Sequence, residues 1–346
     1  MSDAVLLSVL DLSPVVQGST AAVALGNSLE LARRVERLGY HRYWVAEHHN
    51  MASIASSSPA VLIAHLATVT STMRIGSGGV MLPNHASLVV AEQFGMLEAL
   101  HPGRIDLGIG RAPGTDPVTA HALRRSVNQL SAEEFPQQLG ELFGFFTGSF
   151  PERHPYHQIT ATPGLGYLPA IWLLGSSDYS AEVAGVLGLP FSFAHHFASA
   201  NTLPALARYR AAFEPSAYLE RPYAMVAASV ICAENDERAK WLAGPAAVAF
   251  ARRRTGRPSP LGTPQAAAEY SFTPSEHTSL REWTSIVVGG PDRVRRELED
   301  LLARTAADEL MLTTMVYDES DRIRSYELVA QVMSDHVAPL TASPAG

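Results

Sequence analysis

The sequence contains one cysteine and one lysine, Cys232 and Lys240, among its 346 residues. A single cysteine cannot form an internal disulfide, and this one lies in an apolar run, so we expect a reducing, cytoplasmic location. The densest run of basic residues, 252–254, is short and isolated in a chain of formal net charge -8. We therefore expect no nucleic-acid partner. No P-loop and no cysteine-based metal spacing occurs, so we predict no metal site.

Long hydrophobic runs are also missing. The longest apolar run, residues 224–233, is far too short to span a membrane, so we expect no membrane association. The first residues lack a basic leader and include Asp3, which argues against a signal peptide. With 47% hydrophobic and 17% charged residues, the composition is typical of a globular protein with a large core.

Extended apolar segments alternate with helical patterns along the chain. Eight strands are predicted, at residues 5–12, 43–46, 75–82, 105–109, 171–174, 190–194, 224–232 and 309–313. Since no change in composition marks a linker, we predict one (β/α)8 TIM barrel domain over residues 1–346, with a doubly wound open sheet plus a small domain as the rival. Residues 252–284 have little periodicity, and we interpret them as an extended insertion after the seventh strand that forms a mobile lid.

The stretch 73–114 organises this pattern as a strand, a helix and a second strand, which form a parallel βαβ unit. The helix, residues 88–100, is predicted to place Val89, Phe94, Leu97 and Leu100 near one face. Gly78-Gly79 lies inside an apolar strand, which indicates either a bulge where a ligand approaches the backbone or simply tight packing.

Polar side chains follow several of the predicted strands, and a barrel of this kind places its chemistry at those strand ends. Glu47, His48 and His49 follow the second strand. A histidine beside a glutamate could titrate near neutral pH and act as an acid or base, or it could merely hold a loop. His195-His196 after the sixth strand could be catalytic or metal-binding, but a pocket wall is the favoured interpretation.

A possible anion site follows the fifth strand. Gly175, Ser176 and Ser177 precede a predicted helix and offer backbone N–H groups and hydroxyls, which suit a phosphate. An ordinary helix cap is the alternative. Arg111, directly after Gly110 at the end of the fourth strand, could supply the positive charge. The glycines of residues 108–114 do not fit a dinucleotide fingerprint, because the third is one place late and follows Pro113.

Several segments together resemble the bacterial luciferase-like flavin monooxygenases. They are YWVAEHHN, RIGSGGVMLP, GRIDLGIGRAPG, WLLGSSDYSAEVAGVLGLPF and VVGGPDRV, at residues 43–50, 74–83, 103–114, 172–191 and 287–294. The resemblance implies a barrel that receives reduced FMN from a separate flavin reductase. Reaction of that flavin with O2 gives a C4a-peroxide, which oxygenates a small organic substrate. Closure of the lid would shield this intermediate from water.

The resemblance also assigns roles to residues. His48 matches the catalytic histidine, with Glu47 beside it, and Gly78-Gly79 matches a non-prolyl cis peptide under the flavin ring. Arg111 matches the arginine that binds the flavin phosphate. The complete flavin-binding set implied is Ser77, Gly78, Gly79, Gly110, Arg111, Gly175, Ser176, Ser177 and Tyr179. The chain departs from some members at Gly110, where they carry cysteine, and at Gly175, where they carry glutamate.

Three other functions stay open. Related barrels use the deazaflavin F420 for hydride transfer. A metal-dependent barrel hydrolase would need a His-x-His motif after the first strand, where Val9-Leu10-Asp11 stands instead. A non-catalytic flavin-binding barrel is the third. The resemblance further implies a homodimer formed through residues 59–70 and 88–100. We expect an apolar or aromatic substrate, with Tyr156, Tyr167 and Phe197 as candidate pocket residues.

Overall fold

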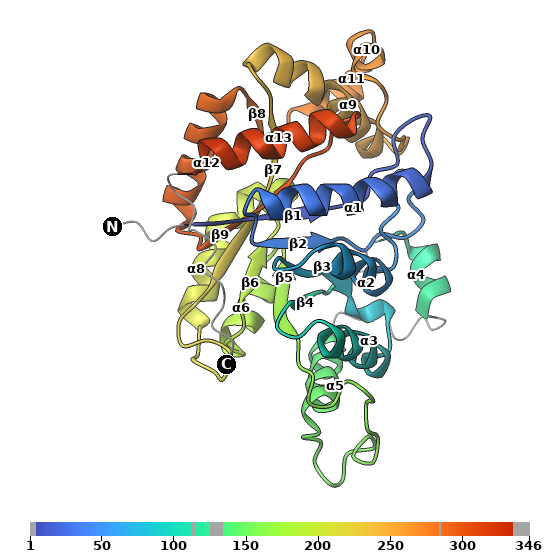
Figure 1. The fold of residues 1–346 in the computed structure, drawn as a ribbon, viewed down its shortest axis with the longest axis vertical. Coiled ribbons are helices and arrows are strands. Elements are labelled where there is room, and N and C mark those ends of the chain that lie inside the picture. Colours follow the sequence, from blue (N-terminus) through green and yellow to red (C-terminus); the bar gives the residue numbers. More distant parts are fainter. Residues whose placement is uncertain (1–4, 113–114, 125–133, 284, 335–346) are drawn as a thin grey trace.

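The computed structural model describes residues 5–112, 115–124, 134–283 and 285–334. Eight parallel strands close into a barrel, because β1 pairs with β2 on one edge and with β9 on the other. Helices surround these strands (Figure 1). The ring consists of β1 (Leu6–Asp11), β2 (Arg42–Val45), β3 (Arg74–Met81), β4 (Ile105–Gly110), β5 (Ala170–Gly175), β6 (Phe191–Phe193), β7 (Ala224–Cys232) and β9 (Glu309–Thr313). The predicted (β/α)8 barrel with an insertion after β7 is thereby confirmed.

One further strand was not predicted. β8 (Ile286–Gly289) is short and pairs with the second half of β7, from Ser229 to Cys232. β6 pairs with the first half of β7, residues 224–226. β9 occupies one edge of β7. β6 and β8 therefore both pair along the opposite edge of β7. β8 therefore lies beside the closed ring and not within it.

The helices mostly follow the predicted pattern. They are α1 (Ala21–Arg37), α2 (Pro59–Val69), α3 (Ser87–Leu100), α4 (Pro117–Arg124), α5 (Phe135–Thr147), α6 (Asp178–Val186), α7 (His195–Ala198), α8 (Thr202–Ala212), α9 (Asp236–Arg254), α10 (Pro264–Ala268), α11 (Pro274–Leu280), α12 (Pro291–Thr305) and α13 (Glu319–Val332), with 3-10 turns η1 (Leu82–Asn84) and η3 (Ser199–Asn201). We did not predict α9, which contains Pro245, or α13, which buries the charged Arg322. Both lack the apolar stripe on which the helix predictions relied.

The insertion after β7 is more regular than its sequence suggested. Its first residues, Arg252 to Arg254, complete α9, and α10 and α11 occupy much of the rest. The end of the predicted lid, Thr284, lies outside the described residues, as do Pro113 and Gly114. The amide N–H of Gln17, in the loop after β1, donates to the carbonyl of Leu261 at 2.8 Å. The insertion is thus tied to the end of a barrel strand, while its mobility stays a prediction.

The predicted single apolar face of α3 is wrong. Phe94 and Leu97 are buried, but Val89 is 43% and Leu100 is 65% exposed. At about 100° per residue, Val89 and Leu100 lie roughly 20° apart around the axis, and Phe94 lies roughly 140° from Val89. The helix therefore carries two apolar stripes, of which one faces the core and the other faces outward.

An arm formed by α5 and residues 148–169 projects from the barrel (Figure 1). Tyr156 stacks on Phe145 with ring centroids 5.7 Å apart and meets Phe150 edge-on. These rings pack against the main hydrophobic core. Tyr156 therefore contributes to this packing, and its place in a substrate pocket stays a prediction.

A buried ionic layer fills the barrel at the ends where the strands begin. Arg42 bonds Asp106 at 2.9 Å and Glu309 at 3.1 Å, and Arg74 bonds Asp106 at 2.8 Å. Tyr223 donates its hydroxyl to Glu309. Burial raises the pKa of Asp106, but the charges of Arg42 and Arg74 outweigh it and hold the pKa below its usual value. The charges of this layer are therefore balanced from within.

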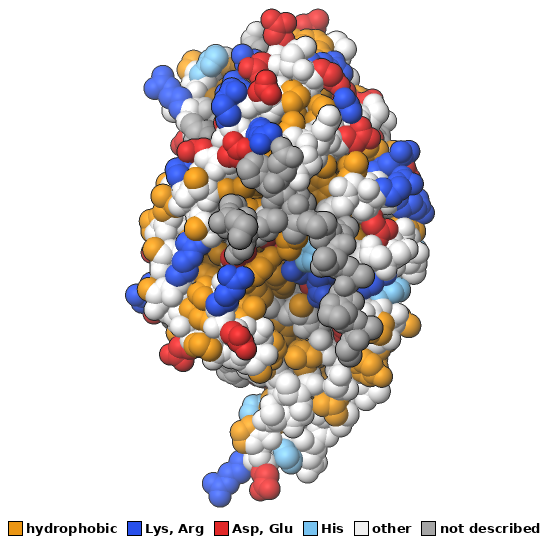
Figure 2. Space-filling model, turned by 60° about the vertical axis from the view of Figure 1, so that its left-hand side comes forward, with side chains coloured by type: hydrophobic (Ala, Val, Ile, Leu, Met, Phe, Trp, Pro, Cys, Tyr) orange, Lys and Arg blue, Asp and Glu red, His pale blue; other side chains and the backbone are white. Residues whose placement is uncertain are grey.

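On the face in Figure 2, basic side chains are scattered among acidic, hydrophobic and uncharged ones. Across residues 5–334, with the gaps given above, none of the helices is both long and apolar enough to cross a bilayer.

Substitution of Arg42 tests how much the buried ionic layer contributes to the stability of the fold. Arg42→Met should lower the free energy of unfolding by about 3–5 kcal/mol, because it leaves two buried carboxylates without their shared cation. Urea denaturation measures this difference. Arg34→Ala, which removes the exposed pair with Glu30 on α1, is the control and should cost no more than about 1 kcal/mol. Equal effects of the two changes would contradict the role given to the ionic layer.

Candidate functional site

A buried carboxylate organises the barrel mouth after β2. Glu47 is fully buried and accepts hydrogen bonds from the rings of His49 at 2.8 Å and His85 at 2.9 Å. The amide N–H of Met81, at the end of β3, donates to its other oxygen at 3.0 Å. Burial raises the pKa of Glu47, but the bonds from His85, His49 and Met81 outweigh it, so the pKa lies below its usual value. Glu47 therefore acts as an ionised anchor for the surrounding loops.

His85 was missed in the sequence. It follows the 3-10 turn after β3, and its partner Glu47 lies 38 positions earlier. The one available signal was its place after a predicted strand, which is the same signal that identified His48.

His48 has an unused ring nitrogen. Its backbone N–H donates to the Ser56 carbonyl at 3.1 Å, but Nδ1 is buried and has no hydrogen-bond partner in the described part of the chain. Burial and the nearby charge of Arg253 lower the pKa of His48, against the opposing charge of Glu47. The imidazole is therefore neutral at neutral pH and able to accept a proton or a hydrogen bond from a ligand.

The predicted glycine pair forms a stretch of bare backbone. The Gly78-Gly79 peptide is cis, as the resemblance implied, and the register between β3 and β4 shifts there. A Cβ atom at Gly79 would lie 2.7 Å from the carbonyl oxygen of Gly108, so no side chain fits. The Ser77 hydroxyl donates to the same oxygen at 2.9 Å. Ser77 therefore serves the β3–β4 contact, and Gly78 and Gly79 pack tightly against Leu10, Trp44 and the backbone of Gly108.

The residues predicted to bind phosphate come together. The guanidinium of Arg111, after β4, lies over the Tyr179 ring at 4.3 Å from its centroid. Tyr179 stands in the first turn of α6, whose N-cap residue Ser177 makes no side-chain capping bond. This argues against the ordinary-cap interpretation and leaves the first N–H groups of α6 available. Ser176 and Ser177 are half-buried beside them.

The other two glycines of the predicted flavin set are also tightly placed. A Cβ atom at Gly110 would lie 2.8 Å from the sulfur of Met81, and one at Gly175 would lie 2.6 Å from the Cβ of Ser180. A side chain at Gly175 would require Ser180 to shift, whereas one at Gly110 would meet the flexible end of Met81, which can move aside.

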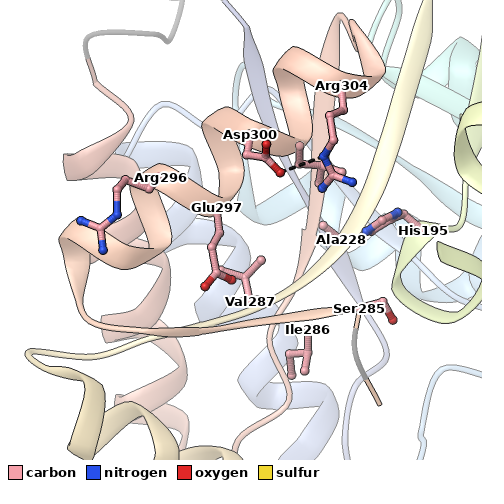
Figure 3. Close-up of a pocket in the computed structure, with 10 residues that line it drawn as sticks. His195, Ala228, Ser285, Ile286, Val287, Arg296, Glu297, Asp300 and Arg304 are labelled. Carbon is pink, nitrogen blue, oxygen red and sulfur yellow. Dashed lines mark hydrogen bonds and ion pairs between the residues drawn. The ribbon is translucent and has the colours of Figure 1, made fainter. Parts of the chain in front are cut away.

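The two histidines after β6 serve different sides of the barrel wall. His196 Nδ1 bonds the Ala227 carbonyl at 3.1 Å, and burial, with smaller contributions from His195, His48 and Arg253, lowers its pKa to about 4. His195 instead lines a hollow of about 320 Å³ between β8 and α12, beside the ion pair of Arg304 with Asp300 (Figure 3). None of the predicted flavin-binding residues lines that hollow. His195 thus lines a hollow, whereas the place of His196 in a pocket wall stays a prediction.

Comparison with known proteins identifies the family. A sequence model described as luciferase-like monooxygenase matches residues 7–309. The chain belongs to the luciferase-like monooxygenase family. This confirms the resemblance and makes the chain an oxidoreductase of that family.

Relatives match this luciferase-like chain over almost their whole lengths. YvbT of Bacillus subtilis strain 168 is 52% identical over 328 residues, which cover 94% of this chain and 96% of YvbT. N-acetyl-S-alkylcysteine monooxygenase of the same strain is 34% identical to this chain. The alignment covers 94% of this chain and 98% of that relative. The crystal structure of apo-MsnO8 has a TM-score of 0.86 and 39% identity, and it covers 97% of this chain and 99% of its own.

More distant structures share the fold alone. The oxygenating component of 3,6-diketocamphane monooxygenase from Pseudomonas putida, in complex with FMN, has a TM-score of 0.72 and 18% identity. An F420-dependent secondary alcohol dehydrogenase has a TM-score of 0.67 and 13% identity. The fold therefore accommodates either cofactor. No cluster of three potential metal-ligating side chains occurs in the described ranges.

The close approach at Gly79 gives the second test. Gly79→Ala should lower the free energy of unfolding by about 1–3 kcal/mol, because its methyl group meets the backbone of Gly108. The control is Gly26→Ala in α1, where no atom lies within 4 Å of the new methyl group. This change should be neutral or stabilise the protein by up to about 1 kcal/mol. Thermal and urea unfolding measure both, and a harmless Gly79→Ala would refute the packing described here.

Proposed function

We propose that this luciferase-like protein is the oxygenating component of a two-component monooxygenase. It takes reduced FMN from a separate flavin reductase and uses O2 to oxygenate a small, mainly apolar or aromatic organic substrate. The observation that carries the proposal is the stacked pair Arg111 and Tyr179 beside the uncapped N-terminus of α6.

The phosphate of FMN fits this end of the mouth. Arg111 can form charge-assisted hydrogen bonds with a phosphate, and Tyr179 holds its guanidinium in place. The hydroxyls of Ser176 and Ser177 and the free N–H groups of α6 can donate to the remaining oxygens. The positive end of the α6 dipole favours the same anion.

The flavin ring fits the bare backbone at Gly78-Gly79. Neither glycine carries a side chain that would separate a planar ligand from the strand. Larger residues do not fit there, because Cβ atoms at Gly78 and Gly79 would each meet protein atoms at 2.7 Å. Bound reduced flavin supplies the two electrons that activate O2. The protein contributes the platform, the anion site and the exclusion of water.

His48 supplies a proton-transfer group at this mouth. Its unpartnered Nδ1 is the atom that would accept or deliver a proton during oxygenation, since its lowered pKa keeps it neutral at neutral pH. Glu47 would act on His48 through the loop that it anchors and through its negative charge, which raises the pKa of His48. Residues 252–284, tied to the loop after β1 by Leu261, would close over the mouth and exclude water.

The phosphate site gives the third test. Arg111→Ala should weaken FMN binding about 10- to 100-fold, the effect of losing a charged hydrogen-bond partner. Titration of flavin fluorescence measures it, with riboflavin, which lacks the phosphate, as a matched ligand. The wild type should prefer FMN to riboflavin, and Arg111→Ala should abolish that preference.

The control variant is Arg208→Ala. It removes an exposed ion pair between Arg208, on α8, and Glu182, on α6. It should leave FMN binding unchanged. An unaltered preference for FMN in Arg111→Ala would refute the phosphate site. Tighter binding of F420 than of FMN, without oxygen uptake on addition of reduced FMN, would instead assign the chain to hydride transfer.

We also propose that the protein is a homodimer joined through α2 and α3, which lie next to each other (Figure 1). Val89, Met96 and Leu100 are 43%, 51% and 65% exposed and follow one stripe of α3, and Val61 on α2 is 62% exposed. Exposed apolar side chains that gather on one face are typical of an interface.

The fourth test concerns this stripe. Met96→Glu should convert the dimer to a monomer, since a carboxylate would be buried unpaired in the interface. Sedimentation velocity at micromolar concentration measures the state. Val118→Glu on α4, where the valine is 79% exposed and outside the stripe, should leave the dimer intact. A monomeric wild type, or a dimeric Met96→Glu, would exclude this interface.

A further inference from the structure

The loop that carries His48 is attached to the rest of the protein on two sides. It connects β2 to α2, and its far half is attached to the loop after β1, where the Ala55 N–H donates to the Ser13 carbonyl at 3.0 Å. Its near half, residues 49–50, bonds instead to the segment after β4. The His48 ring therefore stands between two separate attachments.

The attachment to the segment after β4 consists of two side-chain hydrogen bonds. The Thr115 hydroxyl donates to the His49 carbonyl at 3.0 Å. The side-chain amide of Asn50 donates to Oδ2 of Asp116, also at 3.0 Å. These bonds hold the two residues that directly follow His48 in the chain.

The two oxygens of the Asp116 carboxylate have different partners. Oδ1 accepts from the backbone N–H groups of Val118 and Thr119, both at 3.0 Å, and so caps α4. Oδ2 accepts from the Thr119 hydroxyl at 2.6 Å and from Asn50. The bonds from Thr119 and Asn50 hold the pKa of Asp116 well below its usual range, so the carboxylate stays charged. Because a helix cap needs only one such oxygen, Oδ2 is left to hold the loop.

Asn50 has a backbone conformation that few side chains adopt. Its φ is 55°, in the left-handed region, which asparagine tolerates better than most residues. The bond to Asp116 is the one hydrogen bond that the Asn50 side chain makes within the described residues. This bond therefore fixes the turn immediately after His49.

We infer that Asn50 and Asp116 are positioning residues for His48, whose ring their bond keeps in place at the mouth. This inference rests on the proposed function, in which His48 accepts or delivers a proton during oxygenation. Proton transfer requires the two heavy atoms within hydrogen-bond reach, so a small displacement of His48 would slow it. Since Asp116 belongs to the segment that Arg111 begins, the same bond ties the proton-transfer loop to the proposed phosphate site.

Two substitutions remove the bond from opposite sides. Asn50→Gly keeps a residue that accepts the left-handed backbone and changes no charge, while Asp116→Ser keeps an oxygen that can cap α4. In both variants water should reach the His48 ring more easily. The pKa of His48 should then rise toward the ordinary 6.5, because burial is the main cause that lowers it.

Histidine titration by NMR measures this pKa without any ligand, and the His48 signal is the one missing from His48→Gln. The other charged groups that act on His48, namely Glu47, His49 and Arg253, are the same in both variants. Asn50 and Asp116 are exposed, so both variants should fold, which urea unfolding checks.

The matched control is Thr119→Val, which removes the other donor to Oδ2 of Asp116 but touches only α4. It should leave the pKa of His48 unchanged. The double variant Asn50→Gly/Asp116→Ser should shift the pKa no further than the larger of the two single changes, since both remove one shared bond. An unshifted pKa in Asn50→Gly and Asp116→Ser, or an equal shift in Thr119→Val, would overturn the positioning role.

Flavin binding separates this inference from the function on which it rests. Asn50→Gly should bind FMN as tightly as the wild type, because Arg111 and Tyr179 are untouched, and a loss of FMN affinity would overturn a role specific to His48. A wild type that binds no FMN, together with the expected shifts of the pKa, would refute the proposed function and leave the positioning of His48 in place.

Discussion

The arrangement of the mouth depends on how closely β3 approaches β4. A Cβ atom at Gly76 would lie 2.5 Å from the Cβ of Asp106, and one at Gly108 would lie 2.1 Å from the Ser77 carbonyl oxygen. Glycine at these positions lets the two backbones meet, and the register shift that follows brings the Met81 N–H to Glu47. Through Glu47 the same contact fixes the loops that carry the mouth histidines. A change in this one strand contact would therefore move several groups of the site together.

Charge is distributed unequally along the barrel axis. Where the strands begin, Arg42 and Arg74 are balanced by Asp106 and Glu309. At the other end Asp11 is balanced by Arg322. Because these buried charges are satisfied internally, the free cations at the mouth remain available for ligands. In the proposed function, the phosphate of FMN would find such a cation at Arg111, although the chain as a whole is acidic.

The sequence predicted whatever depended on local pattern. Each strand of the ring came from its apolar run, and Arg111 and Tyr179 were predicted as a pair from their motifs. Contacts between distant segments were not readable. His85 gains its meaning only from Glu47, its hydrogen-bond partner, which lies 38 positions earlier in the chain. The faces of α3 were misjudged because an apolar stripe looks the same whether it packs on the barrel or points outward.

The folded protein favours the neutral forms of His48 and His196. The pKa of His196 is lowered to about 4 and that of His48 also lies below the ordinary 6.5, so the unfolded chain binds more protons than the folded one between these values. The contribution of these two groups to the free energy of unfolding is complete above the pKa that they have in the unfolded chain. It is lost as the pH falls from that pKa to their pKa in the folded protein. Glu47, whose pKa is also lowered, loses its contribution at still lower pH. Near neutrality, His48 and His196 therefore carry no charge, and in the proposed function His48 would gain its proton from the reaction.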